Sequence, residues 1–178
     1  MSSSSGNNPR ASYVPRALGA GLAFMLAGAS ALAGDAQPFV FTAYSDAAGG
    51  ADVVAGRYHA ALAQLRSYPG MTDLDPAATN TNRCVAYSMT LQWRAARAAC
   101  DAAVRASDAQ PMRSADHLAL AYSNRAVMFW LSNDDVAAGK DLARAQALSP
   151  RAEFVARNVA ALKIHGAVAL ARKPAPKS

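Results

Sequence analysis

The chain has 178 residues and a formal net charge of +6. This length suits one compact domain better than two, because domains most often have about 100–150 residues. Alanine dominates, glutamate occurs once and β-branched residues are sparse, which favours helices and argues against a large β-sheet. The basic residues are dispersed among aspartates, whereas a nucleic-acid-binding protein would cluster them.

The N-terminal stretch divides into three zones. Residues 1–16 are polar with two arginines, residues 17–29 are uncharged and apolar, and residues 30–33 (SALA) have the small-x-small pattern of a cleavage site. This order is typical of a secretory signal peptide. We therefore expect residues 1–33 to be removed and the mature chain to begin at or near Gly34 in the periplasm. The net charge then falls from +6 to +4.

The alternative for this stretch is a retained membrane anchor. The uncharged run from residue 17 to 34 has only 18 residues and is rich in Ala and Gly, so it barely spans a hydrocarbon layer of about 30 Å. Cleavage is the favoured interpretation, and it leaves no membrane-spanning segment in the mature chain.

Residues 34–50 are predicted to be an extended or loop segment. Its apolar part, Gln37–Thr42, can lie extended against helices, and Ser45–Gly50 has the composition of a loop. A helix is predicted to begin at Asp52 and to end before Pro69-Gly70. Its apolar positions share one helical face and are Val54, Tyr58, Ala61, Leu62 and Leu65.

Two helical hairpins and a closing helix are predicted next. The expected helices cover residues 77–91, 92–107, 114–131, 134–148 and 151–164. Ser114 is expected to cap its helix, and Pro150 follows the end of the second hairpin. Residues 51–165 thus form one helical domain, and residues 166–178 form a basic, largely disordered tail.

An internal repeat is the strongest signal in the sequence. Asn-Arg-Cys-Val at 82–85 and Asn-Arg-Ala-Val at 124–127 differ only in one small residue, and Asn-Val-Ala-Ala at 158–161 is a weaker copy. The asparagines of these phrases are 42 and 34 residues apart. Such a period is typical of stacked helical hairpins.

The stretch Ala121–Pro150 resembles a tetratricopeptide repeat (TPR), whose period is 34 residues. The residues that carry the resemblance are Ala126, Phe129 and Trp130 in the first helix, Ala138 and Ala145 in the second, and the closing Pro150. The resemblance extends over about residues 51–163. It implies an all-α, right-handed superhelix of helical hairpins, with about two and a half repeats and a capping helix.

TPR-like folds bind peptides on the concave face lined by the first helix of each repeat. The resemblance therefore places candidate partner-binding residues there, namely Asn82, Val85, Asn124, Val127 and Trp130. An asparagine amide can donate to and accept from a partner's backbone. Two alternatives stay open: the asparagines can bridge adjacent helices, and Trp130 can belong to the core. Only Asn124 matches the carboxylate clamp of chaperone-binding TPR domains, so that function is not implied.

Cys84 and Cys100 are predicted to form a disulfide, because paired cysteines in an oxidising compartment are usually bonded. Cys84 takes the small-residue position that Ala126 has in the second hairpin, and Cys100 lies between Ala96 and Ala103 of the next helix. The alternative is two reduced, buried thiols.

No catalytic constellation is recognisable in the sequence, and no metal or cofactor is expected. Ser114, Asp116 and His117 are nearly adjacent and do not face one another on a helix. The sequence thus predicts a non-catalytic protein–protein interaction module of the periplasm or cell envelope, with a peptide or protein partner that the sequence does not specify. The alternative is a structural envelope protein whose basic tail (Arg172, Lys173, Lys177) contacts an anionic surface.

Overall fold

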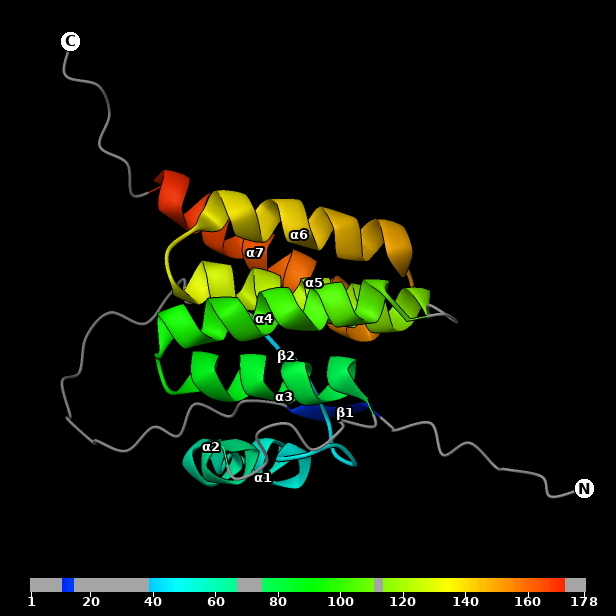
Figure 1. The fold of residues 1–178 in the computed structure, drawn as a ribbon. Coiled ribbons are helices and arrows are strands. Elements are labelled where there is room, and N and C mark those ends of the chain that lie inside the picture. Colours follow the sequence, from blue (N-terminus) through cyan, green and yellow to red (C-terminus); the bar gives the residue numbers. More distant parts are fainter. Residues whose placement is uncertain (1–10, 15–38, 67–74, 111–113, 172–178) are drawn as a thin grey trace, which may run out of the picture.

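The structure is a computed structural model that describes residues 11–14, 39–66, 75–110 and 114–171 (Figure 1). The helices are α1 (Gly50–Val54), α2 (Tyr58–Arg66), α3 (Pro76–Met89), α4 (Trp93–Asp108), α5 (Ala115–Leu131), α6 (Asp135–Leu148) and α7 (Glu153–Ala171). The strands are β1 (Ala11–Val14) and β2 (Phe41–Tyr44). The predicted helical fold class is confirmed. Most of the predicted signal peptide and residues 172–178 of the basic tail lie outside the described residues. Residues 166–171, predicted to belong to the disordered tail, instead form the end of α7.

The helices α3 with α4, and α5 with α6, form two helical hairpins that lie side by side (Figure 1). Side-chain caps define where their helices begin. The Asp75 carboxylate accepts from the Ala78 amide at 3.0 Å, and the Asp134 carboxylate accepts from the Ala137 amide at 3.1 Å. The Ser114 hydroxyl accepts from the His117 amide at 3.4 Å, so the predicted cap of α5 is confirmed.

The single helix predicted from Asp52 onward is wrong, because the chain forms two short helices there. The break lies at Gly56, whose φ of +75° is a left-handed conformation that favours glycine. Arg57 then donates to the Asp52 carboxylate at 2.7 Å across the break. The closing helix α7 begins at Glu153, near the predicted start, and continues to Ala171, beyond the predicted end at Ile164.

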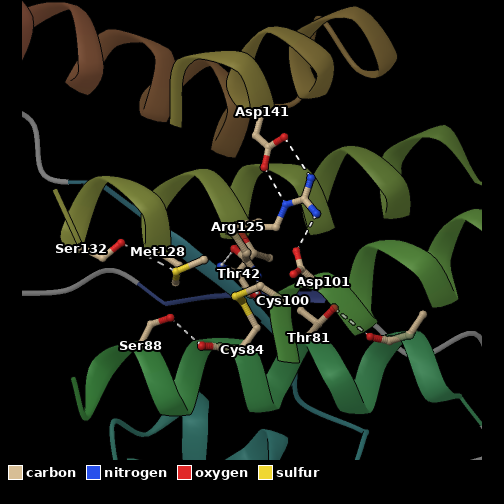
Figure 2. The surroundings of a disulfide bond; sticks show 12 residues. Thr42, Thr81, Cys84, Ser88, Cys100, Asp101, Arg125, Met128, Ser132 and Asp141 are labelled. Carbon is tan, nitrogen blue, oxygen red and sulfur yellow. Dashed lines mark hydrogen bonds and ion pairs between the residues drawn. A yellow bond between two sulfur atoms is a disulfide. The ribbon is translucent and has the colours of Figure 1, made fainter. Parts of the chain in front are cut away.

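The predicted disulfide is confirmed. The sulfurs of Cys84 in α3 and Cys100 in α4 are 2.02 Å apart, and the two Cα atoms are 4.6 Å apart. Both side chains are buried beside Met128 of α5 (Figure 2). The buried Ala96 and Ala99 of α4 belong to the same cluster, and such small side chains let helices approach more closely than the usual 8–10 Å.

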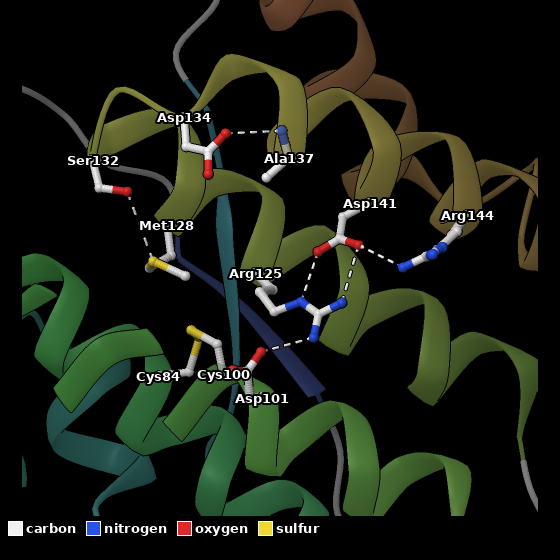
Figure 3. A network of polar contacts seen from close by, with 10 residues as sticks. All are labelled: Cys84, Cys100, Asp101, Arg125, Met128, Ser132, Asp134, Ala137, Asp141 and Arg144. Carbon is white, nitrogen blue, oxygen red and sulfur yellow. Dashed lines mark hydrogen bonds and ion pairs between the residues drawn. A yellow bond between two sulfur atoms is a disulfide. The ribbon is translucent and has the colours of Figure 1, made fainter. Parts of the chain in front are cut away.

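An ionic network joins the second hairpin to α4 (Figure 3). Arg125 of α5 donates to both carboxylate oxygens of Asp141 in α6, at 2.6 and 3.1 Å. It also donates to Asp101 of α4 at 2.8 Å. Burial alone would lower the pKa of Arg125, but its hydrogen bonds and the charges of Asp141 and Asp101 raise that pKa above its ordinary value. The guanidinium therefore stays charged.

The main apolar core surrounds residues 39–44. Phe39, Phe41 and Ala43 share one buried cluster with residues from six helices. The helical members are Val53, Ala61, Leu62, Leu65, Val85, Ala86, Ala126, Val127, Leu142 and Ala161. Part of the stretch predicted as an extended segment thus lies inside the helical core.

The two strands pair antiparallel, with Ala11 opposite Tyr44 and Val14 opposite Phe41. β2 passes between the helices, and β1 lies along its edge near α1 (Figure 1). Within the described ranges, each helix is too short or too polar to cross a membrane.

Candidate functional site

Three buried asparagines hold the backbone of residues 39–44, which we call the inner segment. Asn82 of α3, Asn124 of α5 and Asn158 of α7 form this set, which we call the asparagine ladder. They bind Tyr44, Thr42 and Val40, respectively. The ladder therefore contacts every second residue of the inner segment, in the reverse of chain order.

Each ladder amide makes two hydrogen bonds to one residue. The Asn124 Oδ1 accepts from the Thr42 N–H at 2.9 Å, and its Nδ2 donates to the Thr42 carbonyl at 2.6 Å. Asn82 binds Tyr44 in the same way, with both distances 2.9 Å. Asn158 binds Val40 at 2.7 and 2.9 Å. A neighbouring antiparallel strand satisfies alternate residues with the same two bonds, so the ladder substitutes for a strand.

The ladder is sealed from solvent. Asn82 and Asn158 are fully buried and Asn124 is 2% exposed. Two of the three asparagines also use their second amide proton: Asn82 donates to the Ala48 carbonyl and Asn158 to the Ser123 hydroxyl. Burying an amide without partners costs about 1–3 kcal/mol, so these hydrogen bonds make the burial tolerable. They also fix the register of the inner segment.

Side chains of the inner segment contribute to two clusters. Phe41 and Ala43 belong to the main core, whereas Tyr44 packs with Ala78 and Leu120. The Tyr44 ring meets His117 edge-on, with ring centroids 5.6 Å apart. Burial, and to a lesser degree the charge of Asp75, raises the pKa of Tyr44 well above its ordinary value. The phenol therefore stays neutral.

Three rings lie around the beginning of the inner segment. The ring centroid of Phe39 is 4.2 Å from that of Trp130 and 5.6 Å from that of His165. Trp130 and His165 are 4.7 Å apart. These contacts join α5 and α7 around the start of the inner segment, and aromatic pairs at such distances add about 0.5–1.5 kcal/mol beyond area burial.

A glycine pair allows the chain to turn after the inner segment. Gly49 has a φ of +69°, a conformation that most other residues disfavour. At Gly50 a Cβ atom would lie only 1.8 Å from the Tyr44 carbonyl oxygen and 2.9 Å from the Asn82 amide nitrogen. Only glycine at position 50 lets α1 begin directly beside the end of the ladder.

The structure brings the predicted partner-binding residues together around the inner segment. Asn82 and Asn124 bind backbone, as the sequence suggested for a partner, but this backbone belongs to the chain itself. Val85 and Val127 are 0% and 1% exposed in the main core, and Trp130 is partly buried against that core. With the inner segment in place, the side chains of Asn82, Val85, Asn124 and Val127 are too buried to contact another molecule.

Asn158 is the functional residue that the predicted site omitted. The signal for it was present, because Asn-Val-Ala-Ala at 158–161 follows the second phrase by 34 residues. Of the two open roles of the asparagines, the structure shows helix bridging, which here runs through the backbone of the inner segment. The ladder links α3, α5 and α7 through the strand that it holds.

The arrangement suits backbone recognition. Its polar groups are neutral amides, which bind N–H and C=O groups and do not transfer protons at neutral pH. Within the described residues, no group of three His, Cys, Asp or Glu side chains could hold a metal ion. A separate, open hollow of about 460 Å³ lies at the start of α4 and is lined by Gln92, Trp93, Arg94, Ala95 and Ala98.

The chain matches no family model, no curated protein and no solved structure with which it was compared.

Proposed function

We propose that this protein is a non-catalytic interaction module of the periplasm or cell envelope. It binds an extended segment of a protein partner on the face formed by α3, α5 and α7. The asparagine ladder carries this proposal, because it holds the backbone of the inner segment extended and in a fixed register. A strand held in this way suits an extended polypeptide that binds beside it better than a small molecule.

A TPR-like architecture accounts for the repeated residues. The phrase at 82–85 and the phrase at 124–127 each supply one ladder asparagine from the first helix of a hairpin. The turns agree as well, since Leu91 and Asn133 are the left-handed residues of the two hairpin turns. Stacked hairpins leave the end faces uncovered. Here α1 with α2 lies at one end of the stack and α7 packs on α5 and α6.

An exported location is supported by two independent features. The three-zone N-terminus is typical of a signal peptide. The buried Cys84–Cys100 disulfide is typical of proteins in oxidising compartments.

The inner segment is too well held to leave when a partner arrives. Its release would break the six ladder hydrogen bonds and expose Val40, Phe41 and Tyr44, each at most 6% exposed. A buried side chain of this size contributes about 1.5–3 kcal/mol. A partner must therefore bind beside the inner segment, which stays in place.

Site-specific photo-crosslinking in the envelope tests the proposal. A photoreactive amino acid replaces Met89, which is partly buried against the main core at the end of α3. The matched control carries it at Val136, which is 69% exposed on α6. We expect one partner protein to be crosslinked from position 89 and not from position 136, with the same yield at low and high salt.

The tail-based alternative gives the opposite pattern. Deletion of residues 172–178 would then abolish envelope association, and raised salt would weaken it, because screening at about 1 M salt shortens the Debye length to about 3 Å. That pattern, with no crosslink from position 89, would contradict the interaction module and favour the structural envelope protein.

A further inference from the structure

The strand β2 has two edges, and the ladder takes only one of them. The N–H and C=O groups of Thr42 and Tyr44 point to the ladder. In an extended strand, successive residues direct these groups to opposite edges. The backbone groups of Phe41 and Ala43 therefore point to the other edge, where β1 lies with Val14 and Ser12 opposite them.

The strand that covers this second edge belongs to the predicted signal peptide. Cleavage after Ala33 removes Ala11–Val14 together with the rest of that peptide. If residues 17–34 were instead retained as an anchor, Ala11–Val14 and β2 would lie on opposite sides of the membrane. In both cases, β1 is absent from β2 once the domain has been exported.

Loss of β1 leaves the second edge of β2 without a paired strand. With β1 in place, Phe41 is 6% exposed and Ala43 is 0% exposed. Without it, their backbone N–H and C=O groups lose their partners in a largely apolar setting. Such an edge is a template for pairing with another chain. The opposite edge stays fixed by the ladder, so β2 keeps the geometry that pairing requires.

We propose that the exported protein binds an extended segment of a partner protein as an added antiparallel strand on the vacated edge of β2. This inference rests on the proposed function and specifies its mode of binding. The removed strand shows what fits, because Ala-Ser-Tyr-Val is uncharged and is flanked in the sequence by Pro9 and Pro15. The partner's segment is therefore about four uncharged residues, recognised mainly through backbone.

A second copy of the chain is a poorer occupant than a different protein. The extended stretch that the described mature residues offer is the inner segment, which is already buried in its own core. To donate it, the second copy would lose its own ladder contacts and core packing. A partner with a free extended segment has no such cost.

Amide hydrogen exchange of the mature protein tests the vacated edge directly. The chain is purified from the periplasm, its N-terminus is established by mass spectrometry, and exchange is followed by NMR. We expect the Phe41 and Ala43 amides to exchange at least about tenfold faster than those of Val40, Thr42 and Tyr44, because only the latter are held by the ladder. Addition of a peptide with the sequence of residues 8–17 (NPRASYVPRA) should slow exchange at Phe41 and Ala43 alone.

Backbone methylation of the peptide provides the matched control. N-methylation at Ser12 or Val14 removes a donor that faces β2, whereas N-methylation at Tyr13 removes one that faces away. We expect the first two changes to weaken binding about tenfold or more, as the loss of one hydrogen bond of about 1.4 kcal/mol does. Methylation at Tyr13 should change the Kd by less than about twofold.

Three results would overturn the added strand. One is a native protein that keeps Met1 and has no membrane between β1 and β2. Another is equal protection of all five amides in the mature chain without peptide, whether the protein is a monomer or a dimer by sedimentation. The third is equal weakening by methylation at Tyr13 and at Val14. If a partner is still crosslinked from position 89, the proposed interaction function stands although the added strand is wrong. If the peptide binds but no partner is crosslinked, the open edge of β2 stands and the proposed interaction function is wrong.

Discussion

The two hairpins have the same arrangement of helices, but different interactions link the two helices of each hairpin. Position 82 of the first corresponds to position 124 of the second, and both are asparagines that hold one residue of the inner segment. Two residues further on, the first hairpin has Cys84 and the second has Ala126. The first hairpin is closed by a disulfide to Cys100, whereas the second has no cysteine at all.

An ion pair takes the place of the disulfide in the second hairpin. Arg125 corresponds to Arg83, but Asp141, its partner, corresponds to Ala99. Arg83 instead donates to Asn80 and to the Leu65 carbonyl, at 3.3 and 3.4 Å. A hairpin of this fold can therefore be closed by a covalent bond or by an ion pair, whereas the ladder asparagine is common to both hairpins.

Removal of a ladder amide should have the largest effect, and an equal one in both hairpins. Asn82→Ala or Asn124→Ala leaves the N–H and C=O of one inner-segment residue buried and unpaired. At about 1–3 kcal/mol for each group, we expect the free energy of unfolding to fall by about 4 kcal/mol in either variant, as measured by urea unfolding.

A matched asparagine on the same helix controls for helix propensity. Asn80 is partly exposed, and within the described residues its side chain accepts a hydrogen bond from Arg83, so Asn80→Ala should cost less than about 1 kcal/mol. A large loss at Asn82 with a small loss at Asn124 would show that the two hairpins do not share the ladder role.

Loss of the disulfide should have the next largest effect, confined to the first hairpin. The double variant Cys84→Ala/Cys100→Ala opens a link between positions 16 residues apart, and the chain-entropy model gives a loss of about 3 kcal/mol. Alanine at position 84 copies Ala126, so little of the loss comes from packing. Urea unfolding with and without reductant measures it. Reductant should not change the free energy of unfolding of the double variant. If it also leaves that of the wild-type protein unchanged, the prediction is contradicted.

The matching change in the second hairpin is Asp141→Asn. Asp141 is 2% exposed and accepts from Arg125 and, at 3.3 Å, from Arg144. Hydrogen bonds to charged groups contribute about 1.5–3 kcal/mol, so we expect a loss of about 2 kcal/mol in thermal or urea unfolding. Asp101→Asn is the control, because that carboxylate is more exposed and makes one bond to Arg125. Its loss should be below about 1 kcal/mol; equal losses at the two positions would contradict a closing role for Asp141.

The repeated residues explain why much of this plan was predictable from sequence. The phrases at 82–85 and 124–127 identified two ladder asparagines, and the small residues around them placed Cys84 against Cys100. Ser114 and Pro150 marked helix ends through local chemistry that needs no tertiary information. The spacing of residues in the sequence could therefore predict those contacts and helix ends that form within a single hairpin.

What the spacing could not reveal depends on contacts between distant parts of the chain. The apolar stretch Gln37–Thr42 was expected to lie extended against helices, but its place within the core could not be predicted, because Asn158 meets Val40 from 118 residues away. The ionic contact from Arg125 to Asp101 also joins different hairpins. The break at Gly56 was missed for another reason, since the apolar pattern of one helix continues across it with the same period.

Substitutions in the turns of the two hairpins should have the smallest effects on stability, with opposite signs in the two hairpins. Leu91 and Asn133 both have left-handed backbones, with φ of +59° and +65°, but asparagine tolerates that conformation far better than leucine. The Leu91 side chain is also 66% exposed, so its packing does little to offset the backbone strain. Because a left-handed residue with a Cβ costs about 1–2 kcal/mol, Leu91→Asn should raise the free energy of unfolding by about 0.5–1 kcal/mol. Asn133→Leu should lower it by a similar amount. Urea unfolding of both single variants and of the double swap measures this, and the double swap should lie within about 0.5 kcal/mol of wild type, since separate sites add. A loss of stability in Leu91→Asn would instead mean that the exposed leucine contributes more through packing than its backbone conformation costs.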